Sequence, residues 1–256
     1  MNFSLPNPTN TFKHAIAKGD QQIGLWCSLG NAYTVEIAAS SGYDWILIDT
    51  EHSPNDVNDA LAQLQAAAAY KTHAIVRPAF NDEVLIKRYL DCGAQTLLIP
   101  MINSADEARR AVSYITYPPK GVRGVAGLTR AGRFGRVANY ITTAQQELCL
   151  LLQIESAEGL SNLEAIASTE GVDGIFIGPA DLSASMGYPG QLNHPEVKAA
   201  IADAIKRIRA CGKAAGILTV DTAYAKECIA MGTTFTAVGL DIGVLARGLE
   251  KLREQF

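Results

Sequence analysis

The sequence predicts an α/β protein of the (β/α)8 TIM barrel class, with one domain spanning residues 1–256. Eight short apolar runs rich in β-branched residues alternate with amphipathic stretches of helical period. The runs are continuously apolar, which is typical of parallel strands buried on both faces. Barrels of this class reach about 250 residues as one domain, so the length fits. A doubly wound open sheet is the alternative fold.

The eight apolar runs are the predicted strands. Each is too short to be a buried helix, and right-handed crossovers joining eight parallel strands can close a barrel. In chain order they cover residues 23–30, 45–50, 73–78, 96–101, 149–155, 174–179, 214–220 and 234–240.

Local signals support the helices between these strands. Ser53 is placed to cap a helix with Pro54 at its first position, and Ser104 with Glu107 has the spacing of a capping box. Glycines mark the expected helix ends. They are Gly93, Gly212 and Gly232.

The connection over residues 118–140 is rich in Gly and Arg and is longer than the usual two to six residues. We interpret it as a functional loop, with a solvated surface insertion as the alternative. No repeat, low-complexity tract or change in composition indicates a second domain.

Composition excludes several classes of function. Lys and Arg total 22 against 26 Asp and Glu, so the net charge of -4 offers no overall field for nucleic acid or an anionic membrane. The N-terminus does not resemble a secretory signal, and the apolar runs fall far short of the roughly 20 residues of a membrane span. Five cysteines without a CxxC pair argue against a disulfide framework or a zinc cluster. A reducing cytoplasm fits best.

In a barrel of this class, reactive groups lie at the carboxyl ends of the strands. Four of the predicted strands end in polar residues that do not belong in a core. These residues are Asp49, Glu51 and His52 at the end of the second strand, Arg77 at the end of the third, Gln153 and Glu155 at the end of the fifth, and Asp181 after the sixth.

Glu155 and Asp181 follow strands that are adjacent in a barrel, so their carboxylates should converge. Two carboxylates with water suit a hard divalent cation such as Mg or Mn, with Co also possible. The alternatives are a salt bridge from Glu155 to an arginine and an N-cap role for Asp181.

His52 lies three positions after Asp49, and a nearby carboxylate can fix the tautomer of a histidine for acid–base work. Arg77 can hold a carboxylate, an enolate or a carbonyl oxygen. The alternatives are a capping role for His52 and an ion pair from Arg77 to Asp49 or Glu51. The amides of Ala180 and Asp181 can bind an anion if a helix begins there.

A Schiff-base aldolase needs a lysine near a strand end inside the barrel. The lysines of this chain fall on predicted helices, on loops or before strands. We therefore expect no covalent lysine chemistry. The sequence also contains no P-loop or nucleotide fingerprint, so no organic cofactor is expected.

Seven segments of the chain resemble the metal-dependent (class II) pyruvate aldolases of the 4-hydroxy-2-oxoheptanedioate aldolase and 2-dehydro-3-deoxyglucarate aldolase family, over nearly the whole length. These enzymes have barrels of the phosphoenolpyruvate/pyruvate superfamily. The segments are GLW (24–26), DWILIDTEHSPND (44–56), VRP (76–78), KRYLDCGAQTLLIPM (87–101), RGVAGLTRAGRFGR (123–136), QIES (153–156) and GIFIGPADLSASMG (174–187).

The resemblance implies reversible cleavage of 4-hydroxy-2-oxo acids to pyruvate and an aldehyde. By the same resemblance Glu155 and Asp181 are the metal ligands and Arg77 binds the keto oxygen. His52, paired with Asp49, serves the proton transfers.

The remaining implied residues bind substrate or reach a neighbouring subunit. The amides of Ala180 and Asp181 hold the pyruvyl carboxylate, and Asp91 approaches the histidine of a neighbour. Four further side chains are expected near the substrate. They are Trp26, Arg130, Gln153 and Leu218.

The resemblance also implies a homohexamer, a trimer of dimers that exchange their last helix, within residues 241–256 here. The nearest alternative function is a metal-dependent carbon–carbon lyase acting on an acyl-CoA ester, with the basic residues of 118–140 holding the CoA. A metal-independent glycosidase using Glu155 and Asp181, and a non-catalytic barrel that binds a keto acid, are further alternatives.

Overall fold

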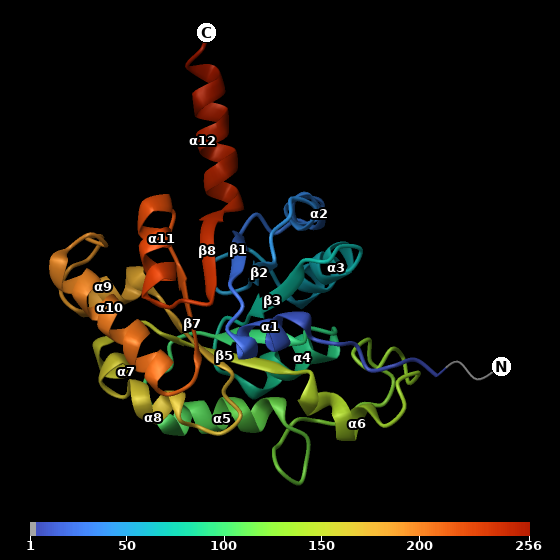
Figure 1. Ribbon diagram of the computed structural model, residues 1–256. Coiled ribbons are helices and arrows are strands. Elements are labelled where there is room, and N and C mark those ends of the chain that lie inside the picture. Colours follow the sequence, from blue (N-terminus) through green and yellow to red (C-terminus); the bar gives the residue numbers. More distant parts are fainter. Residues whose placement is uncertain (1–3) are drawn as a thin grey trace.

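The computed structural model describes residues 4–256, in which eight parallel strands close a barrel in sequential order, β1 to β8 (Figure 1). This confirms the predicted barrel and excludes the open sheet. The strands are β1 (Gln22–Cys27), β2 (Trp45–Asp49), β3 (His73–Arg77), β4 (Thr96–Ile99), β5 (Cys149–Ile154), β6 (Gly174–Ile177), β7 (Ala214–Leu218) and β8 (Phe235–Leu240).

Helices surround the barrel. Each predicted strand was placed correctly, although most end one to three residues earlier than the apolar run. The helices are α1 (Thr11–Lys18), α2 (Ala32–Ser40), α3 (Val57–Ala67), α4 (Glu83–Asp91), α5 (Ala105–Ile115), α6 (Tyr140–Thr143), α7 (Ala157–Ser161), α8 (Leu163–Ala167), α9 (Pro179–Ser185), α10 (Pro195–Ala210), α11 (Thr222–Met231) and α12 (Asp241–Arg253), with a short 3-10 turn η1 (Ala144–Gln146).

The predicted helix signals were partly correct. The Ser104–Glu107 capping box is present at α5, and the three stop glycines lie in left-handed conformations at helix ends. The predicted start at Ser53 is wrong. Asp56 caps α3 and forms a capping box with Asp59, because its carboxylate accepts from two amides of the first turn.

The barrel interior is filled by aromatic and aliphatic side chains, which include Trp45, Phe176 and Phe235. A Cβ at Gly24 would lie 2.1 Å from the Trp45 ring, so only glycine lets this indole fill the barrel. A separate apolar layer packs between the strands and the outer helices.

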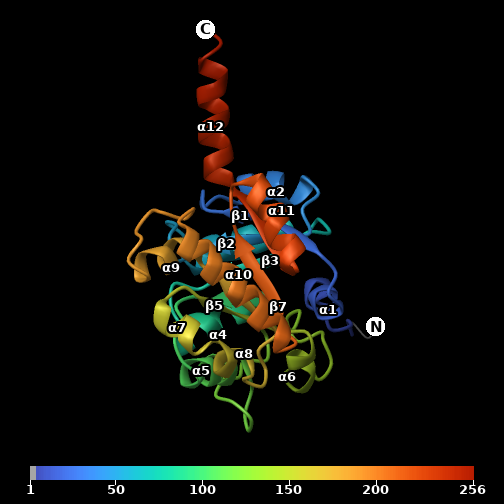
Figure 2. The ribbon, with the colours of Figure 1, turned by 60° about the vertical axis from the view of Figure 1, so that its left-hand side comes forward.

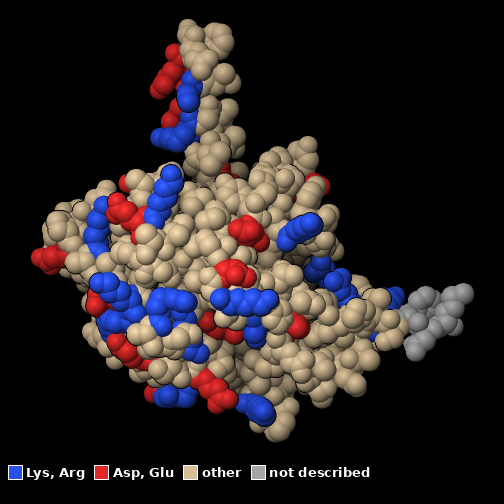
Figure 3. Space-filling view, viewed as in Figure 1, with Lys and Arg blue, Asp and Glu red and all other residues tan. Residues whose placement is uncertain are grey.

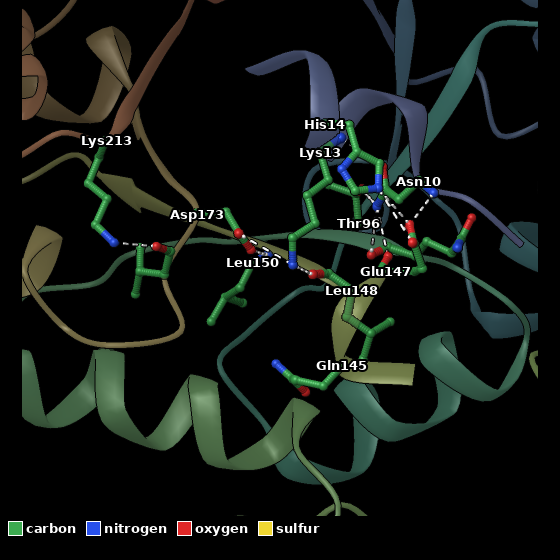
Figure 4. A network of polar contacts seen from close by, with 12 residues as sticks. Asn10, Lys13, His14, Thr96, Gln145, Glu147, Leu148, Leu150, Asp173 and Lys213 are labelled. Carbon is green, nitrogen blue, oxygen red and sulfur yellow. Dashed lines mark hydrogen bonds and ion pairs between the residues drawn. The ribbon is translucent and has the colours of Figure 1, made fainter. Parts of the chain in front are cut away.

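Helix α1 closes the end of the barrel at which the strands begin. Phe12 stacks on His73 with ring centroids 5.5 Å apart. Asn10, which caps α1, donates to Thr96 Oγ1 and to the Glu147 carbonyl, both at 3.0 Å (Figure 4). Because α1 covers this end of the barrel, a substrate can enter only at the end where the strands finish.

Helix α12 stands away from the barrel in both ribbon views (Figures 1 and 2), and none of its residues is buried. Ile242, Leu245, Leu249 and Leu252 recur along it at steps of three and four residues, and each is 48–59% exposed. Charged side chains line one edge of this helix and uncharged ones the other (Figure 3). Across residues 4–256, no helix has the length and apolar character needed to span a membrane.

Candidate active site

Arg77, the last residue of β3, lies at the centre of a polar cluster at the carboxyl ends of the strands. Its Nε donates to Asp49 Oδ1 at 2.9 Å and its Nη2 to Asp49 Oδ2 at 2.7 Å. Its Nη1 forms an ion pair with Glu51 Oε2 at 2.8 Å. The register pairs Asp49 directly with Arg77 on neighbouring strands. The sheet therefore fixes a bidentate contact with the side chain 6% exposed.

Trp26 of β1 contacts both members of this pair. Its indole Nε1 donates to Asp49 Oδ2 at 3.1 Å, and Arg77 Cζ lies 4.9 Å from the centre of the Trp26 ring. Burial by itself would raise the pKa of Asp49. Hydrogen bonds from Arg77, the Glu51 amide and Trp26 outweigh it and hold that pKa below its usual value. Asp49 is therefore a fixed anion that orients Arg77.

Glu51 is the second carboxylate on Arg77. The ion pair between Glu51 and Arg77 is close but is not aligned as a hydrogen bond. Among the described residues, the buried Glu51 Oε2 atom has no hydrogen-bond partner. Burial raises the pKa of Glu51, Arg77 and His52 oppose the rise, and Asp49 and Asp181 add to it. The rise in the pKa of Glu51 is therefore due mainly to its burial.

Glu155 follows β5 and is 2% exposed. Its Oε1 accepts from the Met101 amide at 2.8 Å and its Oε2 from Gln153 Nε2 at 2.6 Å. Burial raises the pKa of Glu155 to about 7. The Met101 hydrogen bond and Arg77 oppose the rise, and Glu51 and Asp181 add to it. The Gln153 Oε1 atom is buried and has no partner in the described part of the chain.

Asp181 and Ala180 lie in the first turn of α9, directly after β6. Both are exposed. Asp181 is near enough to raise the pKa of both Glu51 and Glu155 through charge repulsion. The two predicted ligands, Glu155 and Asp181, therefore lie just beyond the carboxyl ends of the neighbouring strands β5 and β6. The N-cap of α9 is Gly178 and not Asp181.

The structure does not bring the His52 imidazole and the Asp49 carboxylate into hydrogen-bond contact. The His52 backbone amide, and not its imidazole, donates to Asp49 Oδ1, at 3.4 Å. The two Asp49 oxygens are already occupied by Arg77, Trp26 and backbone amides. The imidazole is 67% exposed, and its Nε2 lies 3.9 Å from Glu51 Oε2.

Asp91 and Arg130 are not at the mouth of their own barrel. Asp91 ends α4, and helices that follow strands return to the end at which strands begin. There Asp91 pairs with Arg123 at 3.2 Å, and Arg130 Nη1 donates to the Cys92 carbonyl at 2.7 Å. Residues 118–140 lie at this end because they follow a helix. A cavity of about 600 Å³, lined in part by Arg130, lies here as well.

Leu218 is the last residue of β7 and is half-buried, so it lies at the same end of the barrel as Arg77. Gln153 and Trp26 also belong to this end, through their contacts with Glu155 and Asp49. Of the predicted substrate contacts, only Arg130 is placed elsewhere.

The mouth carries more negative than positive charge. Asp49, Glu51, Glu155 and Asp181 surround one arginine, and oxygen ligands of this kind suit a hard divalent cation. Among residues 4–256, no group of three or more His, Cys, Asp and Glu side chains is arranged to hold a metal ion. A cation bound by Glu155 and Asp181 would fill its other positions with water or substrate oxygens.

Two residues that position Glu155 were missed in the sequence. A Cβ at Gly178 would lie 2.5 Å from Glu155 Oε2, so a side chain there would displace the carboxylate. Met101 has a left-handed backbone, with φ of 51°, and presents its amide to Glu155. The glycine of the segment IGPAD is a signal in the sequence that another group can lie close to the backbone there. No signal in the sequence predicts the left-handed conformation of a methionine after a strand.

Residues 22–247 match the family model described as HpcH/HpaI aldolase/citrate lyase. The chain belongs to this family. It is 61% identical to a pyruvate aldolase of Rhizobium etli over 97% of this chain and 98% of that protein. It is 54% identical to a 4-hydroxy-2-oxo-heptane-1,7-dioate aldolase of Salmonella heidelberg, over 96% of this chain and 94% of that protein.

Two further members support the assignment. A 2-keto-3-deoxy-L-rhamnonate aldolase of Klebsiella pneumoniae is 52% identical over 100% of this chain and 95% of its own length. A crystal structure of a family member from Burkholderia cenocepacia superposes with a TM-score of 0.94 at 39% identity, over 96% of this chain and 99% of that one. The predicted family is therefore confirmed, and the barrel described above is its fold.

The raised pKa of Glu155 makes stability depend on pH. The folded protein holds a proton on Glu155 up to about pH 7, whereas the unfolded chain releases it near 4.5. The stability that protonated Glu155 contributes to the folded protein is fully present below pH 4.5 and is lost as pH rises through about 7. In metal-free protein, Glu155→Gln should therefore gain in melting temperature relative to the wild type between pH 5 and pH 8. The Gln153 amide can turn to accept from the new amide.

Calorimetry of both proteins, with Glu158→Gln as the control at an exposed carboxyl on α7, measures this difference. Divalent cation at pH 8 should stabilise the wild type and not Glu155→Gln. A difference between the two proteins that stays constant from pH 5 to pH 8 would contradict the account.

Proposed function

We propose that the protein is a divalent-metal-dependent pyruvate aldolase that reversibly cleaves 4-hydroxy-2-oxo acids to pyruvate and an aldehyde. The observation that carries the proposal is the buried Arg77 held by Asp49 and Glu51 beside Glu155 at the barrel mouth. Membership of the HpcH/HpaI family and the names of the relatives support it. A pyruvate and an aldehyde are then its small-molecule partners.

Glu155 and Asp181 are the proposed ligands of the cation, which would be Mg, Mn or Co. The charge of Asp181 adds to the raised pKa of Glu155, and a cation bound by both carboxylates would offset that repulsion. When bound, such an ion polarises the keto oxygen of the substrate and stabilises the negative charge that develops there. No organic cofactor is needed for this chemistry.

Arg77 is proposed to donate to the same keto oxygen. Its contacts to Asp49 and Glu51 leave some of its five N–H donors free for a ligand. The Asp49 carboxylate and the Trp26 ring hold the guanidinium still, so little reorganisation is needed when charge develops on the oxygen. The first-turn amides of α9, from Ala180 and Asp181, are proposed to hold the pyruvyl carboxylate.

His52 is the proposed proton carrier, because it is the histidine at the mouth and its imidazole is free to move toward a substrate. Asp49 acts on it through the backbone of residues 51 and 52, which it fixes by two hydrogen bonds. Gln153 positions Glu155 through its hydrogen bond, and Leu218 and Trp26 are proposed to lie near the substrate. Within residues 4–256, no lysine lies on a strand or on the connections that follow strands, which disfavours a Schiff base.

Asp91 and Arg130 are proposed to act on the site of a neighbouring copy, since they lie at the far end of their own barrel. We also propose that α12 is exchanged between two copies and that three such dimers form a homohexamer. The apolar stripe of α12, which is exposed on an isolated chain, supports an exchange.

All five cysteines are free thiols, which supports a reducing cytoplasmic location.

The acyl-CoA lyase is less well supported by the same structure. Its proposed CoA-binding residues, in the segment 118–140, lie at the end of their own barrel away from Arg77 and Glu155, so they could reach a site only in a neighbouring copy. No observation at the mouth favours a large nucleotide ester over a small keto acid.

Pyruvate alone should exchange its methyl protons for deuterium in heavy water, because the site removes a proton from that carbon. We expect exchange to stop after EDTA treatment and to return when Mg, Mn or Co is restored. Proton NMR follows the methyl signal without any choice of aldehyde. Exchange that persists in EDTA would point to another base, and no exchange with any metal would contradict the proposal.

Arg77→Ala should lower the exchange rate about 100-fold or more, the usual loss when a donor to a developing oxyanion is removed. Arg77→Lys should keep part of the rate, because the charge stays but the bidentate contact to Asp49 is lost. The control is Arg207→Ala, which removes a half-buried arginine of α10 that pairs with Glu164 of α8. A folded Arg77→Ala protein with full activity would contradict the role of Arg77.

Light scattering should give a mass six times that of the 27.3 kDa chain. Leu245→Asp with Leu249→Asp should reduce the mass, since a charge on the apolar stripe of α12 opposes its burial. Arg247→Ala, on the charged edge of the same helix, should leave the mass unchanged. A wild-type monomer, or an unchanged mass in the double variant, would refute the helix exchange.

A further inference from the structure

Arg123 is a buried cation on the connection 118–140 to which the proposed function gives no role. Its side chain is 0% exposed, and its Nη2 lies 3.2 Å from Asp91 Oδ1. The guanidinium also lies over the Tyr117 ring, with Cζ 4.4 Å from the ring centre. Its other nitrogens, Nε and Nη1, are buried and have no hydrogen-bond partner in the described part of the chain. Arg123 is therefore a buried charge whose donors are only partly satisfied.

Such an arrangement adds little to the stability of a barrel. One ion pair and one aromatic ring replace only part of the hydration that a guanidinium loses on burial. An apolar side chain of similar volume would fill the same space without leaving N–H groups unpaired. The presence of an arginine at this position therefore needs an explanation other than packing, and its contact with Asp91 suggests one.

Asp91 lies between this buried arginine and the surface. It is the last residue of α4, and its side chain is 24% exposed. Among residues 4–256, only Arg123 donates a hydrogen bond to its carboxylate, and the oxygen that accepts it is Oδ1. Oδ2 is therefore left to accept a hydrogen bond from a group outside this chain.

The backbone around this pair is also fixed. The Ala131 amide donates to the Asp91 carbonyl at 3.3 Å, and the Arg123 amide donates to the Thr116 carbonyl at 3.0 Å. A Cβ at Gly121 would clash with the same Thr116 carbonyl, so only glycine permits this close turn. Because both backbones are held, the Arg123 guanidinium can keep the Asp91 carboxylate in one place.

The His52 imidazole has no such support within its own chain. It is 67% exposed, and its Nε2 lies 3.9 Å from Glu51 Oε2, beyond hydrogen-bond distance. A histidine that carries protons needs a partner that fixes its tautomer and the orientation of its ring. A carboxylate of another copy can serve as that partner only if it is itself held in place.

We infer that Arg123 is a positioning residue, which holds the Asp91 carboxylate where it acts on the His52 imidazole of a neighbouring copy. The inference rests on the proposed function, in which Asp91 reaches the site of a neighbour. Arg123 itself touches no substrate. It acts from the buried side of Asp91, and it gives the connection 118–140 a role in the site of the next copy.

Arg123→Met removes the charge and keeps a side chain of similar length, and water can solvate Asp91 because that carboxylate is partly exposed. With Mn²⁺, we expect kcat for the methyl exchange of pyruvate to fall about tenfold or more, the usual result when a reacting group is no longer held in position. KM for pyruvate should change little, because Arg77 and the α9 amides are its proposed ligands. Arg123→Lys should recover part of the rate, since it keeps the charge.

The matched control is Arg109→Met, which removes an exposed arginine of α5 that pairs with Asp106. It should keep the wild-type kcat and KM. A folded Arg123→Met protein with the wild-type kcat would overturn the inference.

Mixed assemblies separate positioning of a neighbour from support of the same copy. Arg123→Met and His52→Ala are coexpressed with different affinity tags, and hybrids are purified on both tags. About a quarter of their sites combine an intact His52 with an intact Arg123 and Asp91 of the neighbour, if the copies mix at random. We therefore expect activity several times the mean of the two parent proteins. Arg123→Met coexpressed with Asp91→Asn should gain nothing, because every site then lacks one of the two.

A third mixture, Asp91→Asn with His52→Ala, tests the proposed contact between copies by itself. A gain in this mixture without a gain for Arg123→Met with His52→Ala would overturn the inference, because Arg123 would then support only its own copy. If Arg123→Met does not assemble, Arg123→Lys replaces it in both mixtures.

The proposed function has its own readouts in the same experiment. No gain for Asp91→Asn with His52→Ala would refute the contact between copies, and this inference with it. Loss of metal-dependent pyruvate exchange in the wild type would refute the aldolase itself. Failure of the Arg123 mixture alone leaves both of these intact and overturns only the positioning role.

Discussion

The buried contact between Arg77 and Asp49 is the interaction on which the site depends. Directly paired positions on β2 and β3 bring the two side chains together, and the barrel leaves them almost no access to water. Removing one partner of such a pair leaves an uncompensated buried charge, which typically costs about 3–5 kcal/mol. The strands therefore stabilise the arginine in one orientation, and the arginine gives the barrel mouth its positive centre.

The negative groups around this centre exceed what Arg77 can neutralise. Glu51 and Glu155 both have raised pKa values, chiefly because they are buried, and neighbouring carboxylates add to the rise that Arg77 opposes. A cation bound by the proposed ligands would offset the repulsion between these carboxylates. This is the physical reason to place a divalent ion between Glu155 and Asp181.

Much of this account could be predicted from the sequence. The continuous apolar strands predict the barrel. The polar residues at their carboxyl ends predict the positions of Asp49, Arg77, Glu155 and Asp181, because the carboxyl ends of parallel strands meet at one edge. Side-chain pairing could not be predicted in the same way. The spacing of His52 and Asp49 suggested a dyad, whereas three stronger donors occupy the Asp49 carboxylate.

Other features depend on topology or on backbone geometry. The segment 118–140 was expected near the chemistry, but it follows helix α5 and so lies at the opposite end of its own barrel. Asp91 and Arg130 lie there with it. The left-handed turn at Met101 and the close approach of Gly178 to Glu155 are set by tertiary packing, for which a single sequence carries little signal.

The central claim is that the cation and pyruvate meet between Arg77 and the two carboxylates on β5 and α9. A crystal structure of the protein with Mn²⁺ and pyruvate, with anomalous data collected for manganese, tests it most directly. The account predicts an anomalous peak coordinated by Glu155 and Asp181, with the pyruvate keto oxygen facing Arg77. A peak bound elsewhere, or pyruvate bound without contact to Arg77, would contradict it.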